Sequence, residues 1–300
     1  MLWGNFMSSY LTSILIFTGI NLISVLGMFL LMGLTGLLSF GQVGFMAIGA
    51  YAAALGYTKF GLPFGVGMIL GVGISLIVGF IIGTVTLKLK SDYFALATYG
   101  FAEVIKNVLI YFSSFTGGSM GVFGIPATVT LSLVAIIFLV GLVITRNFKV
   151  TKLGRNSLAI RNDELAAKVM GINVFKHKLA VFLLSAVFGS VAGSLLAFST
   201  YYIEPNLFNW NRSISLIVIV FFGGISSLTG VVVAGLALTL LPEFLHFGAE
   251  WRMVIYTLII IVTMIFRPTG LFGRWELSGQ RMLAWFKGQK PSADRGSGEA

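Results

Sequence analysis

Side chains able to act as acids, bases, nucleophiles or metal ligands are scarce in this 300-residue chain. It holds ten acidic residues, two histidines (His177 and His246) and no cysteine. The lack of cysteine excludes disulfides, thiolate metal sites and cysteine nucleophiles. Neither a Walker A phosphate loop nor an HExxH metal motif is present. We therefore expect no catalytic residue, no metal and no cofactor, and a protein that is not an enzyme.

Glu103 and Lys106 form the clearest pair of opposite charges inside an apolar stretch. They stand three residues apart, so on a helix they share one face and can neutralise each other. Ionisable groups within membrane helices often mark transport pathways. Two interpretations stay open, namely an ion pair that orients its helix and a direct role of Glu103 in a pathway.

The polar stretch from Gly154 to Asn173 predicts a short helix outside the apolar segments. Asn162 or Asp163 can cap its start, acidic Asp163 and Glu164 suit its first turn, and Gly171 can end it in the left-handed conformation. A rigid element of this kind could be pushed by a soluble partner and transmit motion. The alternative is a solvated loop that only connects its neighbours.

Two apolar stretches are interrupted by glycines and hydroxyl side chains, at Gly33–Gly44 and at Phe222–Gly230. Paired broken segments are typical of transporters, where unwound backbone lies near the solute path. The predicted path residues are Ser39, Gln42, Glu103, Gly223, Gly224 and Ser226. The alternative is that each glycine cluster is a loop or a site of close packing.

Apolar segments that could position these residues make up most of the chain, which is 57% hydrophobic and 10% charged. They fall at about 11–34, 43–58, 64–87, 93–112, 129–145, 179–199, 213–241 and 253–266. A bilayer core needs about 20 helical residues. The sequence therefore predicts an all-α, polytopic transmembrane bundle of about eight spanning, broken or re-entrant segments. Glycines four apart predict close helix packing within the chain, at Gly67 with Gly71, Gly79 with Gly83, and Gly189 with Gly193.

The positive charge is concentrated beside apolar segments rather than spread along the chain. Eight of the twenty basic residues lie between Arg146 and Lys178, and six more follow Phe266. Such clusters indicate cytoplasmic loops, so we expect the 146–178 loop and the tail in the cytoplasm and no nucleic-acid partner. The 213–241 segment must then begin and end on the outer side, which predicts a re-entrant segment. The first 58 residues carry no charge, so their orientation stays open.

Glu164, Ala166, Ala167 and Gly171 resemble the EAA-type loop of bacterial ATP-binding cassette importer permeases. In that loop a glutamate, paired alanines and a glycine mark the coupling helix that docks onto the ATPase. Over residues 25–272 the chain resembles the LivM-type permeases of branched-chain amino acid importers. This resemblance lies in Gly36–Gln42, Tyr93–Thr98, Thr116–Gly121, Gly223–Gly230 and Phe266–Leu271.

The resemblance implies a type II importer-like permease in a bacterial inner membrane. It implies a heterodimer with a LivH-type paralogue, two soluble ATPases, an extracytoplasmic binding protein, and branched-chain amino acids as solute. It assigns the ATPase contact to Asn162, Asp163, Glu164, Ala166, Ala167, Gly171 and Ile172. Related systems carry urea or short amides, and an ATP-independent secondary transporter or channel for small polar solutes remains the competing class.

Two regions are expected along the chain. Residues 1–272 form the permease domain, with the loop at 146–178 for coupling. Residues 273–300 form a cytoplasmic tail, in which aromatic and basic residues predict a short interfacial helix on anionic lipid, followed by a disordered end.

Overall fold

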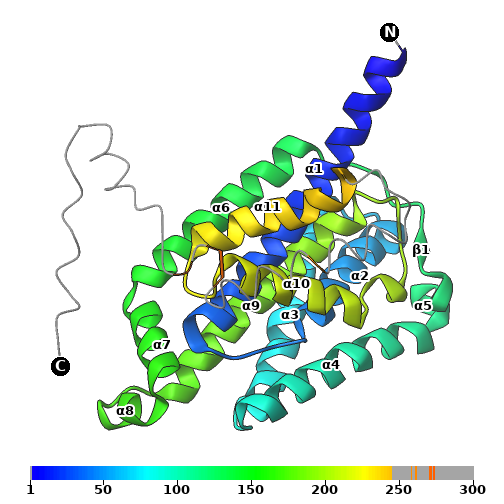
Figure 1. Ribbon diagram of the computed structural model, residues 1–300. Coiled ribbons are helices and arrows are strands. Elements are labelled where there is room, and N and C mark those ends of the chain that lie inside the picture. The colour runs from blue at the N-terminus through cyan, green and yellow to red at the C-terminus, as the bar shows by residue number, and fades with distance from the viewer. Residues whose placement is uncertain (1, 245–257, 259–260, 262–269, 272, 274–300) are drawn as a thin grey trace, which may run out of the picture.

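The computed structural model describes residues 2–244 together with residues 258, 261, 270, 271 and 273, and within them the chain is almost entirely helical (Figure 1). The longer helices are α1 (Leu2–Phe29), α2 (Gln42–Phe60), α3 (Phe64–Thr86), α4 (Ser91–Tyr111), α6 (Leu131–Val150), α7 (Lys152–Asn162), α9 (Val174–Ala197), α10 (Trp210–Gly223) and α11 (Leu228–Phe244). The short elements are a π-helical turn η1 (Leu30–Leu34), α5 (Ser113–Thr116), α8 (Glu164–Val169), and the 3-10 turns η2 (Gly118–Met120) and η3 (Pro205–Leu207). Strands β1 (Val122–Phe123) and β2 (Tyr202–Ile203) pair antiparallel.

The predicted all-α polytopic bundle is confirmed for the part of the chain that is described. Four of its helices are long and apolar enough to cross a membrane, namely Tyr10–Leu34, Phe64–Thr86, Leu131–Val150 and Val174–Ala197. The predicted segment at 253–266 and the tail helix after residue 273 lie outside the described residues, apart from isolated positions.

Helix α3 shows why these sequences pack as a bundle. Its buried residues are Gly67, Gly71, Ser75, Gly79, Gly83 and Thr86, mostly four apart and therefore on one stripe. A β-carbon added at Gly67 would lie 3.0 Å from Ala53 Cα, and one at Gly71 would lie 3.1 Å from Gly49 Cα. The opposite face exposes large apolar side chains such as Ile77 and Ile81. The predicted glycine pairs thus pack within the chain, against α2 and α9.

Helix α2 lies in the interior, where most of its residues are buried. Small residues on both helices let α2 and α9 approach closely, since Gly193 of α9 packs against the Met46 backbone and Ser194 Oγ donates to Gly49 O at 3.0 Å. Contacts advance in the same direction along both helices, so α2 and α9 run parallel.

The orientation of the first helix follows from its contacts with α6. A β-carbon at Gly19 would touch Val134, whereas one at Gly141 would lie 3.4 Å from Leu26 Cδ1, so α1 and α6 run parallel. Helix α6 ends at the basic loop. Helix α1 therefore starts on the face of the bundle opposite the basic loop. This contact gives the orientation of the uncharged N-terminal region, which the sequence could not decide.

Helices α10 and α11 form an antiparallel hairpin. A β-carbon at Gly235 would lie 3.4 Å from Ile219 Cγ2, and one at Gly223 would lie 2.5 Å from Val231 Cα. With 14 and 17 residues, the arms are about 21 and 26 Å long, shorter than a bilayer core of about 30 Å. The predicted break in the 213–241 segment is present, and both ends of the hairpin lie on the same face.

Candidate functional site

The polar loop after α6 folds into two helices held by three side-chain caps. Thr151 accepts a hydrogen bond from Gly154 N at 3.2 Å, Asp163 accepts from Leu165 N and Ala166 N, and Asn173 accepts from Lys176 N at 3.1 Å. Each cap satisfies an amide at the start of α7, α8 or α9. The loop is therefore a defined structure rather than a flexible connection.

Helix α8 has the ends that the sequence predicted. Asp163 Oδ1 lies 2.8 Å from Leu165 N and 3.0 Å from Ala166 N. Gly171 has φ +79° and Ile172 N donates to Ala167 O at 3.0 Å, which closes the last turn. Asn162 instead ends α7, so of the two alternative caps the structure uses Asp163.

Helix α7 was not predicted. Its first half contains Gly154, Asn156 and Ser157, which are poor helix formers. Two contacts compensate, because Gly154 packs against the backbone of Phe148 and Lys149 at the end of α6, and Asn156 Nδ2 lies 3.0 Å from His177 Nε2 of α9.

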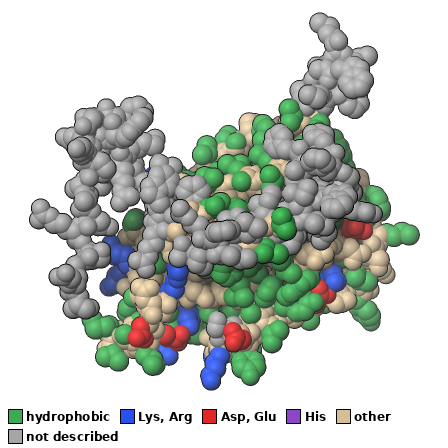
Figure 2. Space-filling view, viewed as in Figure 1, with side chains coloured by type: hydrophobic (Ala, Val, Ile, Leu, Met, Phe, Trp, Pro, Cys, Tyr) green, Lys and Arg blue, Asp and Glu red, His purple; other side chains and the backbone are tan. Residues whose placement is uncertain are grey.

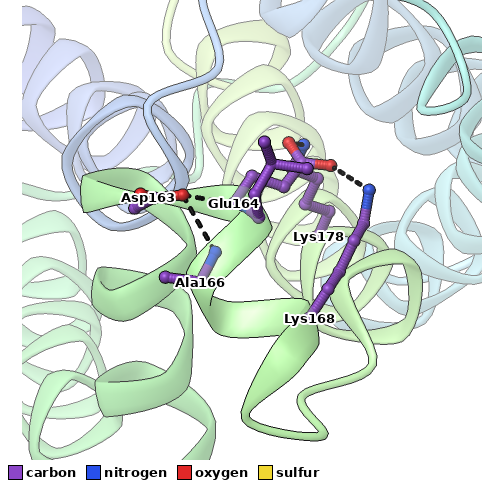
Figure 3. A network of polar contacts seen from close by, with 6 residues as sticks. Asp163, Glu164, Ala166, Lys168 and Lys178 are labelled. Atoms are coloured by element: carbon purple, nitrogen blue, oxygen red, sulfur yellow. Dashed lines mark hydrogen bonds and ion pairs between the residues drawn. The ribbon is translucent and has the colours of Figure 1, made fainter.

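Glu164 joins α8 to the base of α9 (Figure 3). Its Oε2 lies 2.6 Å from Lys178 Nζ, and its Oε1 lies 3.1 Å from Lys168 Nζ. The hydrogen bond from Lys178 is the main cause that holds the pKa of Glu164 below its ordinary value, and Lys168 adds to it. The carboxylate is thus engaged within this chain, and Glu164 positions α8 on α9.

A small separate core lies beneath the loop. Ile160 of α7, Ala167 of α8 and Val174 of α9 are all buried together, with Ile172 packed against them. One buried side chain comes from each of the three helices, so the loop and the first turn of α9 form one packed unit.

The outer face of α8 exposes three large apolar side chains. Leu165 is 74% exposed, Val169 87% and Met170 81%. In Figure 2, acidic and basic side chains gather at the lower left of the view, where α7 and α8 lie, and others lie toward the lower centre and right. The sequence analysis did not identify these three residues, although the four-residue spacing of Leu165 and Val169, with Ala167 between them, indicates an outward face.

Two basic side chains connect this region to the broken segments. Arg161 Nη1 of α7 donates to Gly33 O at 2.7 Å, and Lys149 Nζ of α6 donates to Ser226 O at 3.1 Å. The two breaks also meet, because a β-carbon at Gly33 would lie 2.8 Å from Ile225 O. The sequence analysis predicted neither contact, because nothing in the sequence distinguishes Arg161 and Lys149 from the other basic residues between Arg146 and Lys178.

The first break joins the π-helical turn to α2 through residues 36–41. Ser39 and Gln42 are each 2% exposed. Ser39 Oγ accepts from Gly41 N at 3.1 Å, while Gln42 Nε2 donates to Ser24 O and its Oε1 accepts from Ser185 Oγ at 2.9 Å. Their polar groups therefore satisfy the interrupted backbone and join α1, α2 and α9. A role in contacting solute stays a prediction.

The second break is the turn of the α10–α11 hairpin. Gly223 packs against the backbone of Val231, and Gly224 adopts φ +103°. Ser226 supplies the carbonyl that Lys149 binds, while Ser227 Oγ accepts from Gly230 N at 3.0 Å. The hydroxyl of Ser227 and the ammonium group of Lys149 thus satisfy backbone groups that the break frees from helical bonding.

Glu103 and Lys106 form the predicted ion pair, with Oε2 and Nζ 2.6 Å apart on α4. Their side chains are 28% and 21% exposed. This geometry agrees with the orienting pair, and the role of Glu103 in a pathway stays a prediction. Among the described residues, no three acidic, histidine or cysteine side chains are placed to hold a metal ion.

Residues 10–264 match the family described as "Branched-chain amino acid transport system / permease component". The permease protein LivM of the high-affinity branched-chain amino acid transport system of Salmonella typhimurium is 31% identical, over 90% of this chain and 71% of the relative. The permease LivH of Escherichia coli is 27% identical over 47% of this chain and 46% of its own. The L-arabinose permease AraH of Escherichia coli is 38% identical over 28% of this chain and 24% of its own. No solved structure matches.

Proposed function

The chain belongs to the family of branched-chain amino acid transport permease components, and from this premise we propose that it forms half of the membrane pathway of an ATP-driven importer. Its proposed partners are a LivH-type permease paralogue, two soluble ATPases on the cytoplasmic face and an extracytoplasmic binding protein. The proposed location is the bacterial inner membrane. The partner ATPases hydrolyse ATP, and this chain converts their motion into passage of solute.

The observation that carries the proposal is the outer face of α8. Leu165, Val169 and Met170 are large, apolar and exposed at the tip of a capped helix on the basic face of the bundle. Exposed apolar clusters of this kind, rimmed by charge, are typical of protein–protein contacts. An ATPase subunit that packs on α8 would cover these three side chains, and residues Asn162 to Ile172 would form the contact.

The bonds around the loop support a route for motion. Glu164 holds α8 on α9, while Arg161 and Lys149 bind carbonyls in the first and second break. A displacement of α8 would therefore act on both breaks at once, because the packed loop moves as a unit. The carbonyls of Gly33 and Ser226 lie where the helices are interrupted. The backbone at these points can rearrange without a helix unwinding first.

Branched-chain amino acids are the proposed solute, because a LivM permease is similar to this chain over 90% of its length. Selectivity is proposed to lie mostly in the binding protein, so the same scaffold could serve urea or short amides. Uptake of radiolabelled leucine by proteoliposomes that contain the complete complex tests this assignment. Competition by urea or acetamide, without competition by valine, would reject branched-chain amino acids as solute.

The docking proposal is tested by copurification of ATPase with the tagged chain and its paralogue. Val169→Asp should reduce the copurified ATPase, because it places a charge in the centre of the apolar contact. The matched control is Leu89→Asp, which alters an apolar residue, 44% exposed, in the turn between α3 and α4 on the same face. Equal ATPase recovery from both variants would reject α8 as the docking helix.

Transmission through α7 is tested by Arg161→Met. This variant should retain its ATPase but transport less leucine per ATP hydrolysed, because the bond to Gly33 O is lost. Arg155→Met is the control, since Arg155 Nη1 binds Val150 O within the α6–α7 corner and reaches no break. ATP-independent leucine flux through this chain alone would instead select a secondary transporter or channel.

A further inference from the structure

A cavity whose lining combines charged, polar and apolar side chains lies at the end of the bundle remote from the basic loop. Its walls come from α1, from the turn around η3 and from α10 and α11, and its volume is about 740 Å³. That volume is within the range of about 300–1,000 Å³ that is common for small-molecule sites. Helix α10 places the cavity on the outer face, because its first turn lines the cavity and its last turn ends beside Lys149.

Arg212 is the cation of this cavity. Its Nη2 donates to Asn21 Oδ1 at 3.2 Å, while its Nε is fully buried and has no hydrogen-bond partner. Within the described residues, no carboxylate forms an ion pair with it, and its Cζ lies 5.5 Å from the centroid of the Phe17 ring. A sheltered guanidinium without a counter-ion is costly, and its planar donors fit a carboxylate.

Glu204 supplies the opposite charge to the same cavity. Its Oε2 accepts a hydrogen bond from Tyr202 Oη at 3.0 Å, which holds the side chain in place without a cation. Arg212 and Glu204 are also the only charged residues between Lys178 and Glu243. The cavity thus brings one cation and one anion to a shared space while neither is bound to the other.

The remaining lining distinguishes the kind of ligand. Leu207, Leu216, Ile219 and Leu238 provide apolar surface, and Asn206 and Ser215 add polar groups. An aliphatic side chain of a ligand could pack on the apolar surface, while Arg212 and Glu204 bind the charged groups of the same molecule. A purely apolar occupant, such as a lipid chain, would leave both charges unpaired.

We propose that this cavity is a transient binding site for an aliphatic α-amino acid, whose carboxylate binds Arg212 and whose ammonium group binds Glu204. The proposal rests on the importer function proposed above and names the first site that solute meets within this chain. The site lies apart from the breaks predicted as the path. Solute leaves it readily, because a transport site that held its solute tightly would slow passage.

The test is equilibrium binding of tritiated L-leucine to the complex of this chain, its paralogue and the ATPases in nanodiscs, without binding protein. Leucinamide lacks the carboxylate and 4-methylpentanoate lacks the ammonium group, so both should compete more weakly than unlabelled leucine. Arg212→Gln should weaken leucine binding by about tenfold or more and remove the preference over leucinamide, since a hydrogen bond to a charged group is lost. Glu204→Gln should remove the preference over 4-methylpentanoate.

Lys59→Gln and Asp92→Asn are the controls, because each removes a charge outside the cavity, and leucine binding should stay unchanged. Arg212→Lys keeps the charge and should restore part of the affinity. If Arg212→Gln does not assemble, wild-type competition and Glu204→Gln decide the matter.

Three results would overturn the proposal. One is unchanged leucine binding in assembled Arg212→Gln, and another is equal competition by all three compounds on the wild type. The third is loss of the paralogue from Arg212→Gln with leucine binding unchanged, which would make Arg212 a subunit contact. ATP-driven uptake without this binding would reject the cavity alone, whereas absence of ATP-driven uptake would reject the importer function.

Discussion

Replacing Glu164 with glutamine is expected to loosen α8 from α9 while leaving the bundle intact. The substitution keeps the size of the side chain and removes the charge that Lys178 and Lys168 share. The buried contact of Ala167 in the small core is unaffected by the change. The expected result is a helix that still forms but separates more often from its support.

The magnitude follows from the exposure of the two ion pairs. Lys178 is 11% exposed and Glu164 is 41% exposed, so their bond lies between a sheltered and a surface pair. We assign it about 1 kcal/mol after allowing for solvent screening. The i,i+4 pair with Lys168, which is 55% exposed, adds about 0.3–0.5 kcal/mol. A total of ~1.4 kcal/mol corresponds to a tenfold rise in the population of molecules in which α8 is separated from α9.

Hydrogen exchange of the α8 amides measures this population directly. The Ile172 amide, which bonds Ala167 O, should exchange about tenfold faster in Glu164→Gln than in the wild type if its closing bond breaks with separation. Lys168→Gln is the matched control, because it removes only the weaker and more exposed ion pair. In the full complex, Glu164→Gln should retain most of its ATPase yet move less solute per ATP.

The comparison between the two variants can refute this reasoning. Equal exchange rates in Glu164→Gln and Lys168→Gln would show that the bond to Lys178 does not hold α8 in place. Loss of ATPase from Glu164→Gln with exchange unchanged would show that Glu164 contacts the ATPase itself. That second result would support a direct contact between Glu164 and the ATPase, which is the role that the family resemblance implies.

Three further predictions address pH and the breaks. Since the pKa of Glu164 is lowered, the protection of α8 should be fully present above the ordinary value of 4.5 and lost as pH falls through the lower folded value; exchange across that range measures it. Gly223→Ala should lower the thermal midpoint of the purified complex by an amount equivalent to about 1–3 kcal/mol, because its β-carbon would lie 2.5 Å from Val231 Cα. Gly73→Ala, with open space around it, should not lower that midpoint. Gln42→Leu should destabilise the complex by about 1–3 kcal/mol in the same assay, since buried partners lose their hydrogen bonds.

Local patterns were sufficient to predict the parts of the fold that depend on nearby residues. The four-residue spacing of small side chains in α3 predicts its buried stripe, because helix geometry alone places them on one face. Asp163 and Gly171 likewise predict the ends of α8, since a cap and a left-handed residue act within one turn. The hairpin break was visible because its glycines and serines contrast with apolar flanks.

Contacts between distant segments could not be predicted in the same way. Helix α7 is stabilised by α9 across 21 residues, through Asn156 and His177, against its own weak propensity. Glu164 matched a family position for partner contact, yet its carboxylate binds Lys178, fourteen residues away. Arg161 reaches Gly33 across 128 residues, and no local signal distinguishes that arginine from its neighbours.

The charged cavity was missed for a related reason. Glu204 and Arg212 are eight residues apart, so they share neither a helix turn nor a recognisable motif. They line one cavity because η3 turns the chain before α10 begins, and because α1 supplies Asn21 from the other end of the sequence. Their isolation between Lys178 and Glu243 was the one available signal.

Helix α10 connects the two proposed parts of the mechanism. Its first turn carries Arg212 in the cavity, and its last residue, Gly223, lies in the break that Lys149 binds through Ser226. Fourteen residues make a rod of about 21 Å, and a helix transmits a displacement along its axis with little bending. A movement of the cytoplasmic loop that shifts the break would thus shift Arg212 relative to Asn21 of α1. Coupling and solute release would then depend on the same helix, so Lys149→Met, which removes the bond to Ser226 O, should leave leucine affinity unchanged at rest and weaken only its response to ATP.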